Sequence, residues 1–254
     1  MPSDLPVSQG LSIGIADNHG ARWRPGLGGV CHSEIFAPGG EASGAAAALA
    51  LALDDLDHSP QPVGAEAEDR RALLWVQTRD AARLTGRPYR EGLPEAMRHR
   101  VIHVLAESAE DALFALEEGV RCREIACVLG EIVGNPRALD FTASRRLTLA
   151  AERHEVALYL VRLDAQRDLS SARLRWGVAS APSGPTQWNI RAPGEPAWRA
   201  ELFRARQHPP GEWLLSRQDG ALLAEKLHDK QSYRDGPETE IATSAITQGR
   251  GAFH

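Results

Sequence analysis

The stretch EIFAPGGEASGAAAAL, residues 34–49, decides the fold of this chain. An apolar segment runs through a glycine-rich turn into an alanine-rich segment, which predicts a strand, a tight turn and a helix. Gly39 and Gly44 occupy the two glycine positions of the phosphate-binding loop GxxxxGK[ST], but Ala45 and Ala46 occupy its lysine and hydroxyl positions. The outline of a nucleotide-binding loop is therefore present without the side chains that bind phosphate and magnesium.

Two interpretations of this loop are open on the sequence. In the first, the glycines only allow a tight turn between the strand and the helix. In the second, Gly39, Gly40, Ser43 and Gly44 form a remnant phosphate loop that binds an anion weakly, through backbone amides at a helix N-terminus. Hydrolysis is not expected in either case, because phosphoryl transfer needs a cationic clamp and a metal ligand, and the only two lysines lie in the last 30 residues.

The strand predicted at residues 125–129 supports the same conclusion. A nucleotide-hydrolysing relative would carry an acidic residue at the end of this strand, but Gly130 stands there, and Glu131 is predicted to face the opposite side of the sheet. After the strand at residues 72–76, the polar side chains are an amide and a hydroxyl, which are not general bases. We therefore expect no catalytic residue and no cofactor.

Composition and charge describe a globular protein of 254 residues, with 43% hydrophobic residues and a net charge of −5. No apolar run is long enough to span a membrane, and the first residues lack the pattern of a secretory signal, so the expected location is the cytoplasm, with nucleoid association when the protein is engaged. The three cysteines form no paired CxxC pattern. They favour a reducing compartment and no metal site.

Continuous apolar runs separated by helix-length segments predict an α/β fold, with a mostly parallel central sheet flanked by helices. The predicted buried strands cover residues 30–36, 72–76, 101–105, 125–129 and 156–161. Ser108, and either Asp140 or Thr142, are expected to cap two of the helices, and Gly119 to end the first of these. His103, inside the third run, is predicted to be a hydrogen-bonded core residue.

The sequence changes character from residue 173 onward. The strand-like segments there are predicted to be antiparallel strands added at the C-terminal edge of the sheet, and they cover residues 173–178, 198–206 and 213–215. The predicted organisation is an N-terminal arm at residues 1–29, an α/β domain at 30–217 and a polar, mobile tail at 218–254.

The segment 162–217 is basic within an acidic protein, with nine arginines against five acidic residues. Alternation along a strand places Arg173 and Arg175 on one face, opposite apolar residues, so both are predicted to be exposed. The interpretations are a protein-docking surface, a DNA-backbone contact, or a solvated edge strand protected by charge. A protein partner is favoured over DNA, because only Trp188 is a candidate for base stacking. The candidate contact residues are Arg173, Arg175, Arg199, Arg204 and Arg206.

Residues 26–46 resemble the first strand and phosphate loop of RecA-type recombinases. A closer resemblance is to the ImuA family, which comprises RecA-like proteins of bacterial damage-induced mutagenesis, and it extends over about residues 26–217. The segments that carry it are DALFALEEG (111–119), ACVLGE (126–131), TASRRLTLAAE (142–152), WRAELFRAR (198–206) and GEWL (211–214).

This resemblance implies a RecA-like core, with its degenerate Walker A loop, and a non-catalytic accessory role in SOS-induced error-prone translesion synthesis. The partners that it implies are an ImuB-like protein, an error-prone C-family DNA polymerase and RecA, with no membrane involved. Two alternatives stay open. One is a DNA-binding regulator of RecA filaments, and the other is a nucleotide-dependent recombinase-like ATPase, which the spacing of Gly39 and Gly44 would allow.

Overall fold

The computed structural model describes residues 31–58, 69–184, 189, 192–218 and 221–227. The predicted N-terminal arm lies outside these residues. In this part of the chain, five helices and a single turn of 3-10 helix surround the sheet: α2 (Ser43–Asp57), α3 (Arg79–Thr85), η1 (Arg90–Gly92), α4 (Glu95–Arg98), α5 (Ala109–Arg121) and α6 (Phe141–His154).

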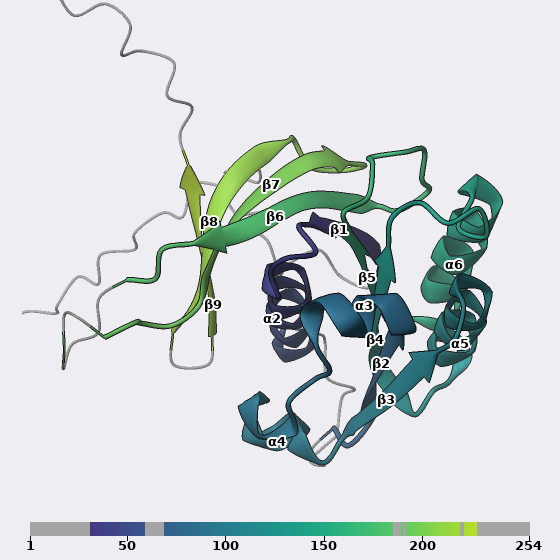
Figure 1. Ribbon diagram of the computed structural model, residues 1–254, viewed down its shortest axis with the longest axis horizontal. Coiled ribbons are helices and arrows are strands. Elements are labelled where there is room, and N and C mark those ends of the chain that lie inside the picture. Colours follow the sequence, from purple (N-terminus) through teal and green to yellow (C-terminus); the bar gives the residue numbers. More distant parts are fainter. Residues whose placement is uncertain (1–30, 59–68, 185–188, 190–191, 219–220, 228–254) are drawn as a thin grey trace, which may run out of the picture.

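Within the described ranges, nine strands form one mixed sheet in the order β3-β2-β4-β5-β1-β6-β7-β8-β9. Their bounds are β1 His32–Ala37, β2 Ala72–Thr78, β3 Val101–Ala106, β4 Ile125–Val133, β5 Ala157–Leu163, β6 Leu174–Ala181, β7 Ala197–Ala205, β8 Gly211–Gln218 and β9 Ala221–Leu227. The first six strands are parallel, and β7, β8 and β9 continue the sheet in antiparallel fashion (Figure 1). The predicted α/β class is confirmed, and the arrangement is consistent with a RecA-like core.

Helices cover the two faces of the sheet in separate layers (Figure 1). On one face, α2 packs on a hydrophobic core that includes Ile35, Trp75 and Val161. On the other face, α5 and α6 pack on a second core that includes Leu74 and Leu158. The antiparallel strands extend away from α6, so the face that α5 and α6 share is left without a helix over β6 and β7 (Figure 1).

Both predicted helix caps are present. The Ser108 hydroxyl accepts a hydrogen bond from the Asp111 amide at 3.1 Å, and the Asp140 carboxylate accepts one from the Ala143 amide at 2.7 Å. Gly119, however, does not end α5. It packs against Leu74, where a Cβ atom would overlap the leucine side chain, so this glycine serves the close approach of helix and sheet.

Four details of the sequence-based prediction need correction. The strand β3 lies at an edge of the sheet, and His103 is exposed there, with a 2.9 Å hydrogen bond to Gln77. The strand β6 pairs with β1 in parallel rather than antiparallel fashion. The strand β9 falls in the segment assigned to the tail, so the sheet extends to Leu227. Helix α3 was not predicted, because its seven residues carry little apolar periodicity.

Candidate functional site

The glycine loop joins β1 to α2 in the way that the sequence predicts, and Gly44 explains why. A Cβ atom on Gly44 would lie 2.7 Å from the Cβ of Ala37 and 2.8 Å from Cγ1 of Val161. Only glycine lets the first turn of α2 approach β1 and β5 this closely. Ser43 is buried beside it, so its hydroxyl does not line an open phosphate site.

A carboxylate of the chain itself binds the loop. Asp164 follows β5 in a left-handed conformation with φ of 50°, and its Oδ1 accepts a hydrogen bond from the Gly39 amide at 2.8 Å. A side chain at position 39 would overlap this carboxylate. In a nucleotide-binding loop, such amides donate to phosphate oxygens. Here an internal anion takes one of them.

A second carboxylate lies in the same loop. Glu41 accepts hydrogen bonds from the amide and the hydroxyl of Ser180 at 2.9 and 2.5 Å, and these bonds lower the pKa of the Glu41 side chain. Gly40 is exposed and has open space around it. Asp164 and Glu41 are negatively charged, as a nucleotide phosphate is. The loop therefore repels the phosphate that a loop of this sequence pattern would otherwise bind.

The cavity next to the loop, of about 490 Å³, offers no compensating positive charge. Its two arginines are both paired: Arg167 with Glu201 at 2.5 Å, and Arg199 with Glu212 at 2.5 Å. With Asp164 in the lining, acidic side chains outnumber basic ones. The cavity therefore does not replace the missing lysine.

Glu131 faces away from the side of Gly130, as predicted, and its role is structural. The side chain is 1% exposed and accepts hydrogen bonds from Trp75 at 2.6 Å, Gln77 at 2.9 Å and Thr85 at 2.9 Å. Burial raises the pKa of this carboxyl group, although the three donors oppose the shift. These contacts fasten α3 to β2 and β4, and they occupy the oxygens that a general base would need.

Of the five candidate arginines, Arg175 is 3% exposed, so the prediction that it is exposed is wrong. Its Nε donates to the fully buried Glu34 carboxylate at 2.8 Å, and Arg162 and Asp168 complete a charged cluster within 4.0 Å. The chain between β5 and β6 covers this face, and Ser170 from that segment also donates to Glu34 at 2.7 Å. Strand alternation could not reveal a covering loop.

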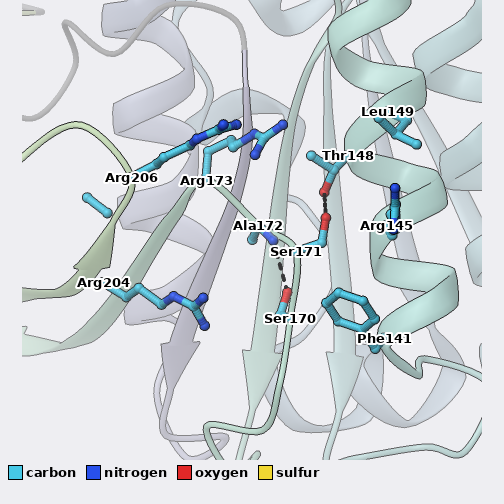
Figure 2. Close-up of a pocket in the computed structure, with 11 residues that line it drawn as sticks. Phe141, Arg145, Thr148, Leu149, Ser170, Ser171, Ala172, Arg173, Arg204 and Arg206 are labelled. Carbon is cyan, nitrogen blue, oxygen red and sulfur yellow. Dashed lines mark hydrogen bonds between the residues drawn. The ribbon is translucent and has the colours of Figure 1, made fainter.

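Three of the other candidates come together with a fourth arginine. Arg173, Arg204 and Arg206 line one open groove with Arg145 of α6, and we call this cavity of about 510 Å³ the arginine groove (Figure 2). Its remaining lining consists of Phe141, Thr148, Leu149, Ser170, Ser171, Ala172 and Ala205. Arg199 lies on β7 but outside this groove, in the cavity next to the glycine loop.

Most of the charge in the arginine groove is unneutralised. Arg173 forms an ion pair with Glu152, and this contact lowers the pKa of the glutamate. In the part of the chain that the structure describes, Arg145, Arg204 and Arg206 form no ion pair. The groove therefore has a net positive charge that is available to an anionic ligand.

No protein-family model matches the chain. The curated proteins include relatives from two strains of Caulobacter vibrioides, NA1000/CB15N and ATCC 19089/CB 15, both named protein ImuA. Each is 35% identical over an alignment of 161 residues, and the match covers 58% of this chain and 61% of the relative. The chain is therefore similar to these ImuA proteins over the matched residues. The chain spans about three fifths of the length of these relatives.

The match to the ImuA proteins confirms the resemblance inferred from the sequence, but two features of the site came only from the structure. Asp164 was not predicted because its partner, Gly39, is 125 positions away. Arg145 was not among the candidate contact residues, but the structure places its exposed side chain in the groove, while the neighbouring Arg146 pairs with Glu117 at 2.6 Å. The spacing of Phe141, Arg145 and Leu149 on one helix face was a usable signal.

Among the described residues, no helix is long and apolar enough to cross a membrane. The same part of the chain contains no group of three or more His, Cys, Asp or Glu side chains that could hold a metal ion.

Proposed function

We propose that this chain is a non-catalytic, RecA-like accessory protein of damage-induced, error-prone translesion DNA synthesis, and that it acts by binding other proteins. The observation that carries the proposal is the hydrogen bond from the Gly39 amide to the Asp164 carboxylate. It puts a negative charge where a nucleotide-binding loop receives a phosphate. The ImuA relatives supply the setting of DNA damage and mutagenesis.

The energetics favour loss of nucleotide binding. A charge-assisted contact to phosphate contributes about 1.5 to 3 kcal/mol, and the chain lacks it because Ala45 replaces the lysine. Ala46 removes the hydroxyl ligand of magnesium, and the carboxylates of Asp164 and Glu41 add repulsion. These terms act in the same direction, so the fold retains the frame of an ATPase without its function.

The proposed partners are an ImuB-like protein, an error-prone C-family polymerase and RecA. The direct test is biolayer interferometry with the immobilised chain and each purified partner. We expect a complex with the ImuB-like protein or with RecA, and an affinity for the ImuB-like protein that changes by less than about twofold when ATP and Mg²⁺ are added. A monodisperse monomer that binds none of the three would contradict the proposal.

A second candidate, a DNA-binding regulator of RecA filaments, is favoured by the arginine groove. It predicts binding to single-stranded oligonucleotides that weakens steeply between about 50 and 200 mM salt.

The third candidate, a recombinase-like ATPase, predicts DNA-stimulated phosphate release. Gly44→Arg is not a useful variant for that assay, because any side chain at position 44 collides with β1 and β5 and would disrupt folding.

A further inference from the structure

We propose that the arginine groove binds an acidic peptide segment of a partner protein, one that also carries apolar side chains. This inference rests on the proposed function and identifies the surface that it uses. The groove contributes four guanidinium groups, from Arg145, Arg173, Arg204 and Arg206, against one carboxylate at its rim, Glu152. Guanidinium groups form paired hydrogen bonds to carboxylates, so the groove suits a ligand with several Asp or Glu side chains.

The groove also offers apolar surface between its charges. Phe141 and Leu149 are exposed by 43% and 51%, and with Arg145 they form a stripe at four-residue spacing along α6. Such a stripe is about 12 Å long, from a rise of about 1.5 Å per residue. It presents one charge flanked by two apolar side chains, which a peptide can match with an acid between two apolar anchors.

The floor of the groove is held in place before any ligand arrives. The hydroxyl of Ser171 bonds to Thr148 of α6 at 2.9 Å, and the Ala172 amide donates to the Ser170 hydroxyl at 3.1 Å (Figure 2). Ser170 also bonds to Ser144 at 2.8 Å, and it donates to the buried Glu34. A ligand therefore does not have to order this segment, which favours affinity.

The composition of the groove favours a peptide over a nucleic acid. Phe141 is the only aromatic residue in the lining, whereas sequence-tolerant binding of single strands uses several aromatic platforms. The net charge of the chain, −5, repels a long polyanion outside the groove. A short acidic segment meets only the local positive charge.

The test uses fluorescence anisotropy with the 254-residue chain and four fluorescein-labelled probes. The first is a 14-residue peptide of Asp, Glu, Leu and Phe residues. In the second, Asn and Gln replace its acids, and in the third, Ser replaces its Leu and Phe residues. The fourth is a thymidine oligonucleotide of 14 nucleotides. We expect the first peptide to bind and the second and third to bind at least about tenfold more weakly.

A matched pair of double variants locates the binding site. Arg145→Glu/Arg206→Glu reverses one arginine on α6 and one at the end of β7, both in the groove. Arg123→Glu/Arg153→Glu reverses two exposed arginines outside the groove, one shortly after α5 and one on α6. The change in net charge is the same, so a general electrostatic effect would be equal in both. We expect the groove variant to lose at least about tenfold in peptide affinity and the control variant less than about twofold.

Circular dichroism and the urea midpoint establish that both variants fold. Three outcomes would overturn the inference: no binding of the first peptide up to 1 mM, equal losses in the two double variants, or tighter binding of the oligonucleotide than of the peptide through the same arginines. The last outcome would assign the groove to nucleic acid. These probes contain none of the proposed partner proteins. The peptide proposal for the groove can therefore fail while complexes with those partners form, and the partner proposal can fail while the peptide binds.

Discussion

At the scale of single residues, Asp164 determines the state of the glycine loop. Its left-handed backbone conformation directs the carboxylate at the Gly39 amide, and aspartate tolerates this conformation better than most residues with a Cβ atom. This single hydrogen bond uses a backbone donor that a phosphate-binding loop would offer to its ligand. The residue thus combines a local structural role with a consequence for function.

Replacement of Asp164 should reveal both roles. In Asp164→Ala the Gly39 amide loses its acceptor and the left-handed backbone loses a tolerant side chain, so we expect a loss of about 1 to 2 kcal/mol in the free energy of unfolding. Asp164→Asn keeps an oxygen acceptor and a residue suited to this conformation, and it should lose less than about 1 kcal/mol. Urea denaturation measures both values. Equal losses would show that the hydrogen bond is unimportant.

His32 gives the fold a defined response to acid. It is fully buried, its Nδ1 lies 2.9 Å from the Thr148 hydroxyl, and its Nε2 has no hydrogen-bond partner among the described residues. Burial lowers the pKa of His32 from 6.5 to about 4, and the charges of Arg175 and Arg162 add to the shift while Glu34 opposes it. Between about pH 4 and pH 6.5, therefore, His32 binds a proton in the unfolded chain but not in the folded chain.

Stability should be retained above about pH 6.5 and should fall as the pH drops toward 4. The contribution of His32 amounts to about 2 kcal/mol lost between pH 7 and pH 5, at about 1.36 kcal/mol per unit of pKa difference. Urea unfolding of the wild type and of His32→Gln at both pH values isolates this contribution. The variant should show the smaller loss, and an identical pH dependence in the two proteins would contradict the assignment.

At the scale of elements, a buried charged cluster joins β1, β6 and the chain between β5 and β6. Glu34 forms an ion pair with Arg175. The Arg175 guanidinium also lies 5.1 Å from the ring centre of Phe36 and 5.3 Å from the ring centre of Phe203. Arg162 is 1% exposed and adds a second buried guanidinium. This cluster holds the floor of the arginine groove against the sheet.

Removal of the central carboxylate should be costly. Glu34→Ala leaves Arg175 buried without the carboxylate to which its Nε donates, and it removes one of the two carboxylates near Arg162. Breaking a buried ion pair typically costs about 3 to 5 kcal/mol. Glu107→Ala is the control, because its ion pair with Arg79 is exposed and screened by solvent, so its loss should change the free energy of unfolding far less. Urea denaturation compares the two. Equal losses would show that the cluster does not stabilise the fold as described.

Many of the helices and strands could be predicted from the sequence. Apolar runs located the five parallel strands up to β5, and the caps at Ser108 and Asp140 located two helices, because these signals depend on neighbours in the sequence. The exposure of Arg175 was predicted wrongly, since it depends on a segment that covers the sheet from elsewhere. Strand β9 was missed because its short apolar pattern carries charged residues at its end.

At the scale of the whole molecule, the two candidate sites differ in character. The glycine loop has kept its place in the fold but is bound by Asp164, while the groove beside α6 has kept unpaired arginines. Positive charge has thus gathered away from the position where a RecA-like ATPase binds nucleotide. This distribution of charge suits a protein that binds other macromolecules. It does not suit an ATPase, which needs positive charge at the nucleotide loop.

The most direct test of this account is a calorimetric titration of the wild-type chain with ATP and Mg²⁺ up to several millimolar. We expect no saturable heat, because Asp164 accepts the hydrogen bond of the Gly39 amide and no lysine stands at position 45. Saturable binding at one site per chain with a Kd below about 1 mM, equivalent to about −4 kcal/mol, would contradict it.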